Sequence, residues 1–116
     1  MYKLSYMENE FSALTRLVKA FIDERDWDQF HNPKDLALAL SIEASELNES
    51  FLWKKPEDAK PEKVREELAD VLIYALLLAR KYGWDIPAIV KEKLAANAVK
   101  YPVEKAKGNA KKYSEF

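Results

Sequence analysis

Glu43-Ala44-Ser45-Glu46 and Glu67-Leu68-Ala69-Asp70 are two acidic segments in the apolar middle of the chain. The first follows the apolar run 36–42, and the second precedes the apolar run 71–78. In each segment the two carboxylates are three positions apart, which places them on one face of a helix with Cβ atoms about 5–6 Å apart. Ionised carboxylates enter an apolar interior only when they are paired or bind a metal ion. If two such helices pack together, the four acids converge on one cation site.

Composition limits the class of protein. The chain has 116 residues, 48% hydrophobic content and 2 Gly, which suits one compact domain over residues 1–116. Its 19 basic and 20 acidic residues leave no charge excess that would favour nucleic acid or a membrane as partner. The absence of Cys excludes disulfides, thiol catalysis and the usual structural zinc sites.

Residues 1–8 lack the apolar core of a signal peptide, and the longest apolar run, 71–79, is too short to span a bilayer. We therefore expect a cytoplasmic protein.

Apolar residues recur at helical spacing, and punctuation residues divide the pattern into four helices. Asn32 and Pro33 are typical of a helix start, Gly83 is placed as a C-cap, Asp85 is placed as an N-cap, and Pro102 ends the last helix. The predicted helices cover roughly residues 8–26, 33–53, 61–82 and 86–101.

No alternating strand pattern competes, so the sequence predicts an all-α fold, a four-helix bundle. The helices over about 33–53 and 61–81 are apolar over more of their circumference than a monomer of this length covers, which predicts an oligomer. The basic tail, about residues 103–116, is expected to be loosely ordered.

The four acids favour a hard cation. Mg²⁺ is commonly shared between carboxylates, waters and substrate phosphates, so the cluster predicts Mg²⁺ and a phosphate-bearing substrate. An isolated Glu-x-x-Glu more often lies on a solvated helix face, and Glu49 and Glu66 are interpreted in that way. A di-iron bundle needs Glu-x-x-His motifs, whereas the single histidine, His31, lies outside both acidic segments.

Five segments in order along the chain resemble the MazG-like nucleotide pyrophosphohydrolases, most closely their dCTP pyrophosphatase branch. The similarity covers about residues 10–113, and its signature is Glu-x-x-Glu followed by Glu-x-x-Asp. The segments are Trp27-Asp28-Gln29-Phe30-His31, Leu38-Ala39-Leu40-Ser41-Ile42-Glu43-Ala44-Ser45-Glu46-Leu47, Phe51-Leu52-Trp53-Lys54, Glu66-Glu67-Leu68-Ala69-Asp70-Val71-Leu72-Ile73-Tyr74 and Asn97-Ala98-Val99-Lys100-Tyr101-Pro102.

The resemblance implies an all-α enzyme of the MazG type that depends on Mg²⁺, with Mn²⁺ as a possible substitute. It implies hydrolysis of a nucleoside triphosphate, dCTP or modified dCTP, to the monophosphate and pyrophosphate, as a house-cleaning activity. The implied metal ligands are Glu43, Glu46, Glu67 and Asp70, and either Glu43 or Glu46 is the expected catalytic base toward water. Relatives form homodimers or homotetramers made of two dimers, with the substrate near an interface.

Substrate contacts are expected from two groups of residues. Asn97, Lys100 and Tyr101 share one face of the fourth helix, and the resemblance places this segment at the phosphates, with Lys54 as a further candidate. A flat apolar slot for the base is expected from aromatic residues, with Tyr74 near the sugar. The candidates for the slot are Trp27, Phe30, His31 and Trp53.

One position departs from the family pattern. Some dCTP-type relatives have a further histidine where this chain has Val18, which affects the expected preference for cytosine. The alternatives are a non-catalytic nucleotide-binding regulatory module, a purely structural oligomer, or a sibling enzyme that hydrolyses dUTP or phosphoribosyl-ATP.

Overall fold

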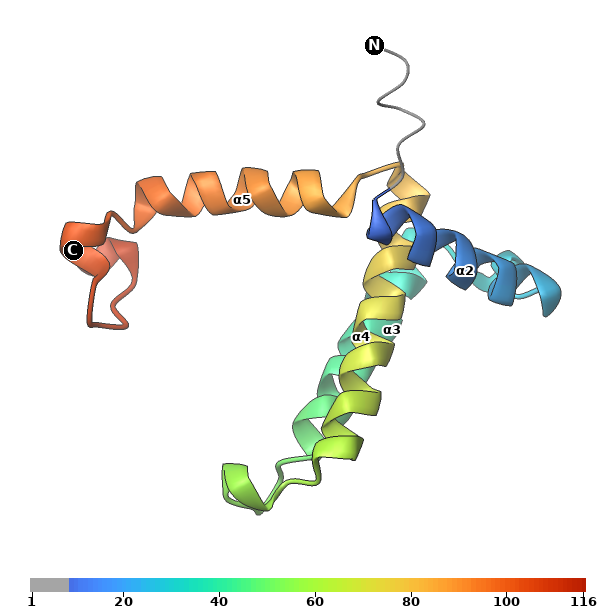
Figure 1. Cartoon of the computed structure of the whole chain (residues 1–116), viewed down its shortest axis with the longest axis horizontal. Coiled ribbons are helices and arrows are strands. Elements are labelled where there is room, and N and C mark those ends of the chain that lie inside the picture. Colours follow the sequence, from blue (N-terminus) through green and yellow to red (C-terminus); the bar gives the residue numbers. More distant parts are fainter. Residues whose placement is uncertain (1–8) are drawn as a thin grey trace, which may run out of the picture. The chain divides into compact units, whose positions relative to one another are not determined.

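The computed structural model describes residues 9–116, and within this range it contains five α-helices, three short 3₁₀ turns and no strand (Figure 1). The predicted all-α fold is confirmed. The helices are α2 (Glu10–Glu24), α3 (Pro33–Glu49), α4 (Pro61–Tyr82), α5 (Ile86–Lys100) and α6 (Val103–Ala106).

The helix boundaries follow the capping residues in the sequence. The side chain of Asn32 accepts a hydrogen bond from the backbone N–H of Asp35 at 2.9 Å, and Pro33 begins α3. Gly83 ends α4 with a φ of 70°, a left-handed conformation that glycine adopts without steric cost. The Asp85 side chain caps α5 by accepting from the N–H of Ala88 at 3.1 Å.

The second helix is shorter than predicted. We expect it to continue to about Trp53, but α3 ends at Glu49. The following residues tighten into turns in which the N–H of Phe51 bonds the carbonyl of Asn48 at 3.0 Å, and Trp53 has a φ of 60°. Such i to i+3 bonds commonly replace α-helical bonding in a last turn, and a positive φ at Trp53 is incompatible with a helix.

Residues 9–84 form one compact unit, in which α3 and α4 lie side by side as a helical hairpin and α2 packs on α4 (Figure 1). Its core is formed by Ile22, Leu36 and Leu77, one residue from each of the three helices. This packing fixes the faces of α3 and α4 that carry the two acidic segments.

Residues 85–116 form a second unit. Within it, α5 buries no residue, and the rings of Tyr113 and Phe116 pack edge-on against Tyr101 at centroid distances of 6.1 and 5.8 Å. The predicted loosely ordered tail thus contains α6 and ring contacts. The single domain, the four-helix packing and the oligomer stay predictions. Among residues 9–116, no helix combines the length and apolar character needed to cross a membrane.

Candidate active site

The acidic segments of α3 and α4 face each other. Glu43 and Glu46 come from α3 and Glu67 from α4, and one carboxylate oxygen from each lies within 4.8 Å of the others. The helical spacing of the first pair places both side chains on the face that packs against α4. Three of the four predicted acids therefore converge, and we call these three the carboxylate cluster.

Negative charges crowd around Glu43 and shift its pKa. A hydrogen bond with the Glu46 carboxyl group, burial, and the negative charges of Glu46, Asp70 and Glu67 together raise the pKa of Glu43 to about 7. A proton shared between Glu43 and Glu46 relieves part of the repulsion. The cluster therefore holds more negative charge than its surroundings neutralise, as expected of a cation site.

Asp70, the fourth predicted acid, lies beside the cluster. It is exposed, and it is close enough for its charge to raise the pKa of Glu43. Asp70 and Glu43 both line a cavity of about 430 Å³ in the first unit. A cation held by the cluster would thus adjoin this cavity.

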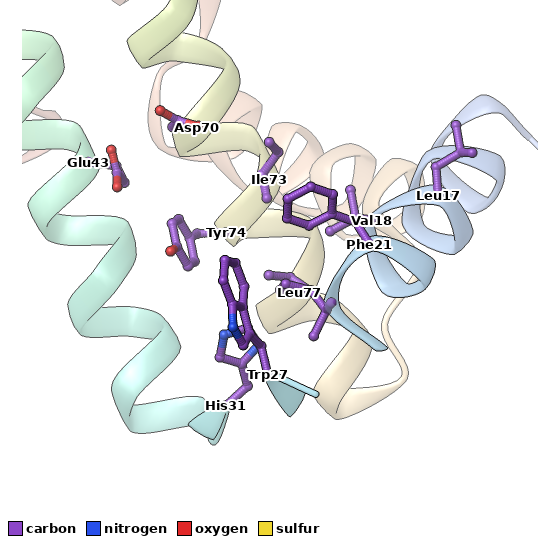
Figure 2. Close-up of a pocket in the computed structure, with 11 residues that line it drawn as sticks. Leu17, Val18, Phe21, Trp27, His31, Glu43, Asp70, Ile73, Tyr74 and Leu77 are labelled. Atoms are coloured by element: carbon purple, nitrogen blue, oxygen red, sulfur yellow. The ribbon is translucent and has the colours of Figure 1, made fainter. Parts of the chain in front are cut away.

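The cavity has an acidic end and an aromatic end. Figure 2 shows Glu43 and Asp70 toward one end, Trp27 and His31 toward the other, and Tyr74 between them. Burial and the nearby charge of Glu43 raise the pKa of Tyr74, which keeps its hydroxyl protonated and able to donate. The lining residues are Leu17, Val18, Phe21, Ile22, Trp27, His31, Glu43, Asp70, Ile73, Tyr74 and Leu77.

His31 lines this cavity and has one polar atom without a hydrogen-bond partner among the described residues. This atom is the buried Nδ1. Unpaired buried polar atoms are rare in native proteins, so this nitrogen is suited to a ligand or a water. The ring of Trp27 lies at the same end and packs edge-on against Phe21 at 5.9 Å.

The aromatic end is fixed by an ion pair. Between α2 and α3, the chain forms the 3₁₀ turn Asp28–Phe30, which Trp27 precedes and His31 follows. Asp28 accepts a hydrogen bond from Lys81 at 3.1 Å and lies 3.5 Å from Arg80, both at the end of α4. A hydrogen bond from Lys81 and the positive charges nearby lower the pKa of Asp28.

Other predicted site residues lie outside the lining of this cavity. The side chain of Phe30 is exposed, Trp53 is 98% exposed, and Lys54 is exposed. Asn97 and Lys100 are in α5 of the second unit, followed by Tyr101, and the Lys100 ammonium lies 4.9 Å from the centre of the Tyr113 ring. The assignment of these residues to substrate binding stays a prediction.

Sequence reasoning missed several residues around the site. Leu17 and Phe21 of α2 and Ile73 and Leu77 of α4 line the cavity, and each pair is spaced i, i+4. That spacing also describes an ordinary core face, so it does not distinguish a cavity wall from a core. Lys63, one turn before Glu67, was also missed, although it lies 2.7 Å from the Glu67 carboxylate.

The donor set fits a hard divalent cation. Carboxylate oxygens are the ligands that Mg²⁺ and Mn²⁺ prefer, whereas the cluster includes no histidine or cysteine. A carboxylate cluster beside a cavity with an aromatic end is an arrangement suited to a substrate with both phosphates and a planar ring.

Comparison with known proteins agrees with this arrangement. The MazG-like family model matches residues 38–116. The chain is 41% identical to dCTP pyrophosphatase 1 of Bos taurus over 117 aligned positions, which cover 94% of this chain and 69% of the relative. It is 40% identical to the Homo sapiens protein of the same name over the same shares.

A solved structure is also similar. The crystal structure of a pyrophosphatase from Archaeoglobus fulgidus matches with a TM-score of 0.76 and 36% identity, covering 83% of this chain and 95% of that one. The fold and site define an all-α protein with a carboxylate cluster that could hold a metal ion. The chain belongs to the MazG-like family.

Proposed function

We propose that this protein is a nucleoside triphosphate pyrophosphohydrolase that acts on dCTP or a modified dCTP. Water adds to the triphosphate, the bond between the α and β phosphates breaks, and the products are the monophosphate and pyrophosphate. The observation that carries the proposal is the cavity that joins Glu43 and Asp70 at one end to Trp27 and His31 at the other. The curated relatives named dCTP pyrophosphatase 1 support the same substrate.

The aromatic end is proposed to hold the base. Trp27 supplies a flat apolar face, and His31 Nδ1 is available to hydrogen-bond a polar edge of the ring. Tyr74, which lies between the two ends of the cavity, is the proposed contact for the sugar. Binding in a mostly apolar cavity would also remove bulk water from part of the base.

The acidic end is proposed to hold Mg²⁺ or Mn²⁺ through Glu43, Glu46, Glu67 and Asp70. When bound, such a cation offsets the charge of the triphosphate and makes water a better nucleophile. Glu43 is the favoured acceptor for the proton of the attacking water, because it lines the cavity whereas Glu46 is not among the lining residues. Asn97, Lys100 and Tyr101 are proposed phosphate contacts on the strength of the family resemblance.

The test is pyrophosphate release from a panel of canonical and modified NTPs and dNTPs that includes dCTP, 5-methyl-dCTP and dUTP. We expect release that needs Mg²⁺, stops with chelator and favours cytosine deoxynucleotides. Glu43→Gln should reduce turnover by about 100-fold or more without loss of fold. Glu49→Gln is the matched control, because Glu49 is an exposed glutamate on the same helix.

The outcomes separate the alternatives. Preference for dUTP would assign the chain to a sibling activity. Nucleotide binding without release from any member of the panel would indicate a regulatory module. Release that chelator leaves unchanged would contradict the cation site. A cytoplasmic location and a homo-oligomeric state are part of the same proposal.

A further inference from the structure

Glu67 has an unusual environment within the carboxylate cluster. Among the residues that the structure describes, it is the one charged residue whose side chain is buried, with 9% of that side chain exposed. Burying an unpaired carboxylate is costly, because water no longer solvates its charge. Glu67 therefore needs a positive partner whenever no metal ion is present.

Lys63 supplies that partner from the same helix. Lys63 lies one turn before Glu67 in α4, and its Nζ is 2.7 Å from Oε1 of Glu67. The hydrogen bond to Glu67 and the negative charges of Glu67, Glu66 and Glu46 raise the pKa of Lys63, so the ammonium also interacts with the α3 side of the cluster. The side chain of Lys63 is 54% exposed, which leaves the ammonium free to move into solvent.

A tethered ammonium and a divalent cation compete for the same carboxylate. Both are positive, and both need an oxygen of Glu67 at bonding distance. An ammonium that stays beside an occupied site repels the cation, and one that leaves gives up its ion pair. Either way, Lys63 reduces the net free energy gained when a cation binds.

We propose that Lys63 is the internal counter-ion of the cation site: its ammonium neutralises Glu67 in the metal-free protein and yields Glu67 when a divalent cation binds. Lys63 is thus a positioning residue, and it sets the cation affinity. This inference rests on the proposed function, because it assumes that the cluster binds Mg²⁺ or Mn²⁺.

The experiment measures Mg²⁺ and Mn²⁺ affinity of the full chain by calorimetry at pH 8 and low salt, without nucleotide. The variant is Lys63→Met, which keeps the length of the stem and removes the charge. Lys60→Met is the matched control, because Lys60 is an exposed lysine one turn earlier whose side chain makes no capping bond. We expect Lys63→Met to bind the cation about fivefold more tightly, and the gain to shrink at high salt.

Thermal unfolding gives an independent readout. In chelator, Lys63→Met should unfold at a lower temperature than the wild type and Lys60→Met, and saturating Mg²⁺ should close that gap. If Lys63→Met does not fold, Lys63→Gln is used in its place. Unchanged or weaker cation binding by the charge-removed variant, with normal binding by the wild type, would overturn the role of Lys63 alone. No cation binding by the wild type would overturn the cation site itself.

Discussion

Lys81 donates a hydrogen bond from Nζ to Oδ1 of Asp28 at 3.1 Å across 53 positions of sequence, and so joins the end of α4 to the turn between α2 and α3. Asp28 lies between Trp27 and His31, the two residues at the aromatic end of the cavity. The pair therefore affects the aromatic end indirectly, because it holds the backbone that carries the rings of Trp27 and His31.

Asp28→Asn should loosen this turn and leave the carboxylate cluster unchanged. We expect the KM for dCTP to rise about two- to fivefold while kcat stays close to that of the wild type. A partly exposed ion pair contributes little to the stability of the fold, but this one holds the turn that carries the proposed base-binding residues. Steady-state kinetics of the variant give both constants. Asp58→Asn, an exposed aspartate distant in sequence, should leave both unchanged.

The pH dependence of this pair has a definite sign. The pKa of Asp28 is lower in the folded protein than its ordinary value of 3.8, so the pair stabilises the fold above about pH 3.8 and loses this effect as pH falls through the folded pKa. The wild type and Asp28→Asn should thus converge in melting temperature in strong acid. A constant difference down to pH 2 would contradict this.

The pH dependence of stability that Glu43 contributes has the opposite sign to that of Asp28. Its pKa is 4.5 ordinarily and about 7 in the folded, metal-free protein, so the folded state binds this proton more tightly than the unfolded chain does. Stability in chelator should therefore fall as pH rises from about 4.5 to 7, and Glu43→Gln should remove this part of the fall. Melting temperatures of both proteins between pH 4 and 8 measure the difference, which a parallel pair of curves would refute.

His31 should be a determinant of base binding. Replacing it with Ala removes the unpaired Nδ1, and we expect the KM for dCTP to rise about tenfold, the effect of one lost hydrogen bond. The fold should lose little stability, because this nitrogen bonds no described residue. An unchanged KM for every nucleotide in the panel would exclude His31 from base recognition.

Leu36 is the most deeply buried residue of the core, with 1% of its surface exposed. Leu36→Ala should lower the free energy of unfolding by about 3 kcal/mol, as measured by urea denaturation. Leu38, on the same helix, is mostly exposed, and its replacement by Ala should cost well under about 1 kcal/mol in an isolated chain. A large loss at Leu38 would mean that another copy of the chain covers it.

Much of the fold follows from the sequence because local signals decide it. Asn32, Gly83 and Asp85 act on the backbone beside them, so their caps are readable without tertiary information. The convergence of Glu43 and Glu67 is also predictable, since each acidic segment adjoins an apolar run and the two helices that carry these runs are expected to pack together. The end of the second helix was predicted too late, because the turns that follow Glu49 and include the positive φ of Trp53 leave no trace in hydrophobic spacing.

The remaining parts of the site depend on distant contacts. Nothing local indicates that Asp28 meets Lys81, or that Leu17 lines a cavity and not a core. Lys63 and Glu67 are an ordinary i, i+4 pair in sequence, and the burial of Glu67 alone gives the pair its importance. Such burial is a property of the packed helices and has no sequence pattern of its own.

The continuity of α4 has a consequence for the spacing of the site. One uninterrupted helix carries Asp70 at the acidic end, Leu77 in the cavity wall and Lys81 at the support of the aromatic end. From Asp70 to Lys81 the helix advances about 16 Å, so its fixed rise sets the separation between the acidic end of the cavity and the support of its aromatic end. One inserted residue would turn everything beyond it by about 100°. In the proposed binding mode, one rigid helix therefore fixes the distance between the acidic end and the support of the aromatic end, and a change in the length of α4 would alter it.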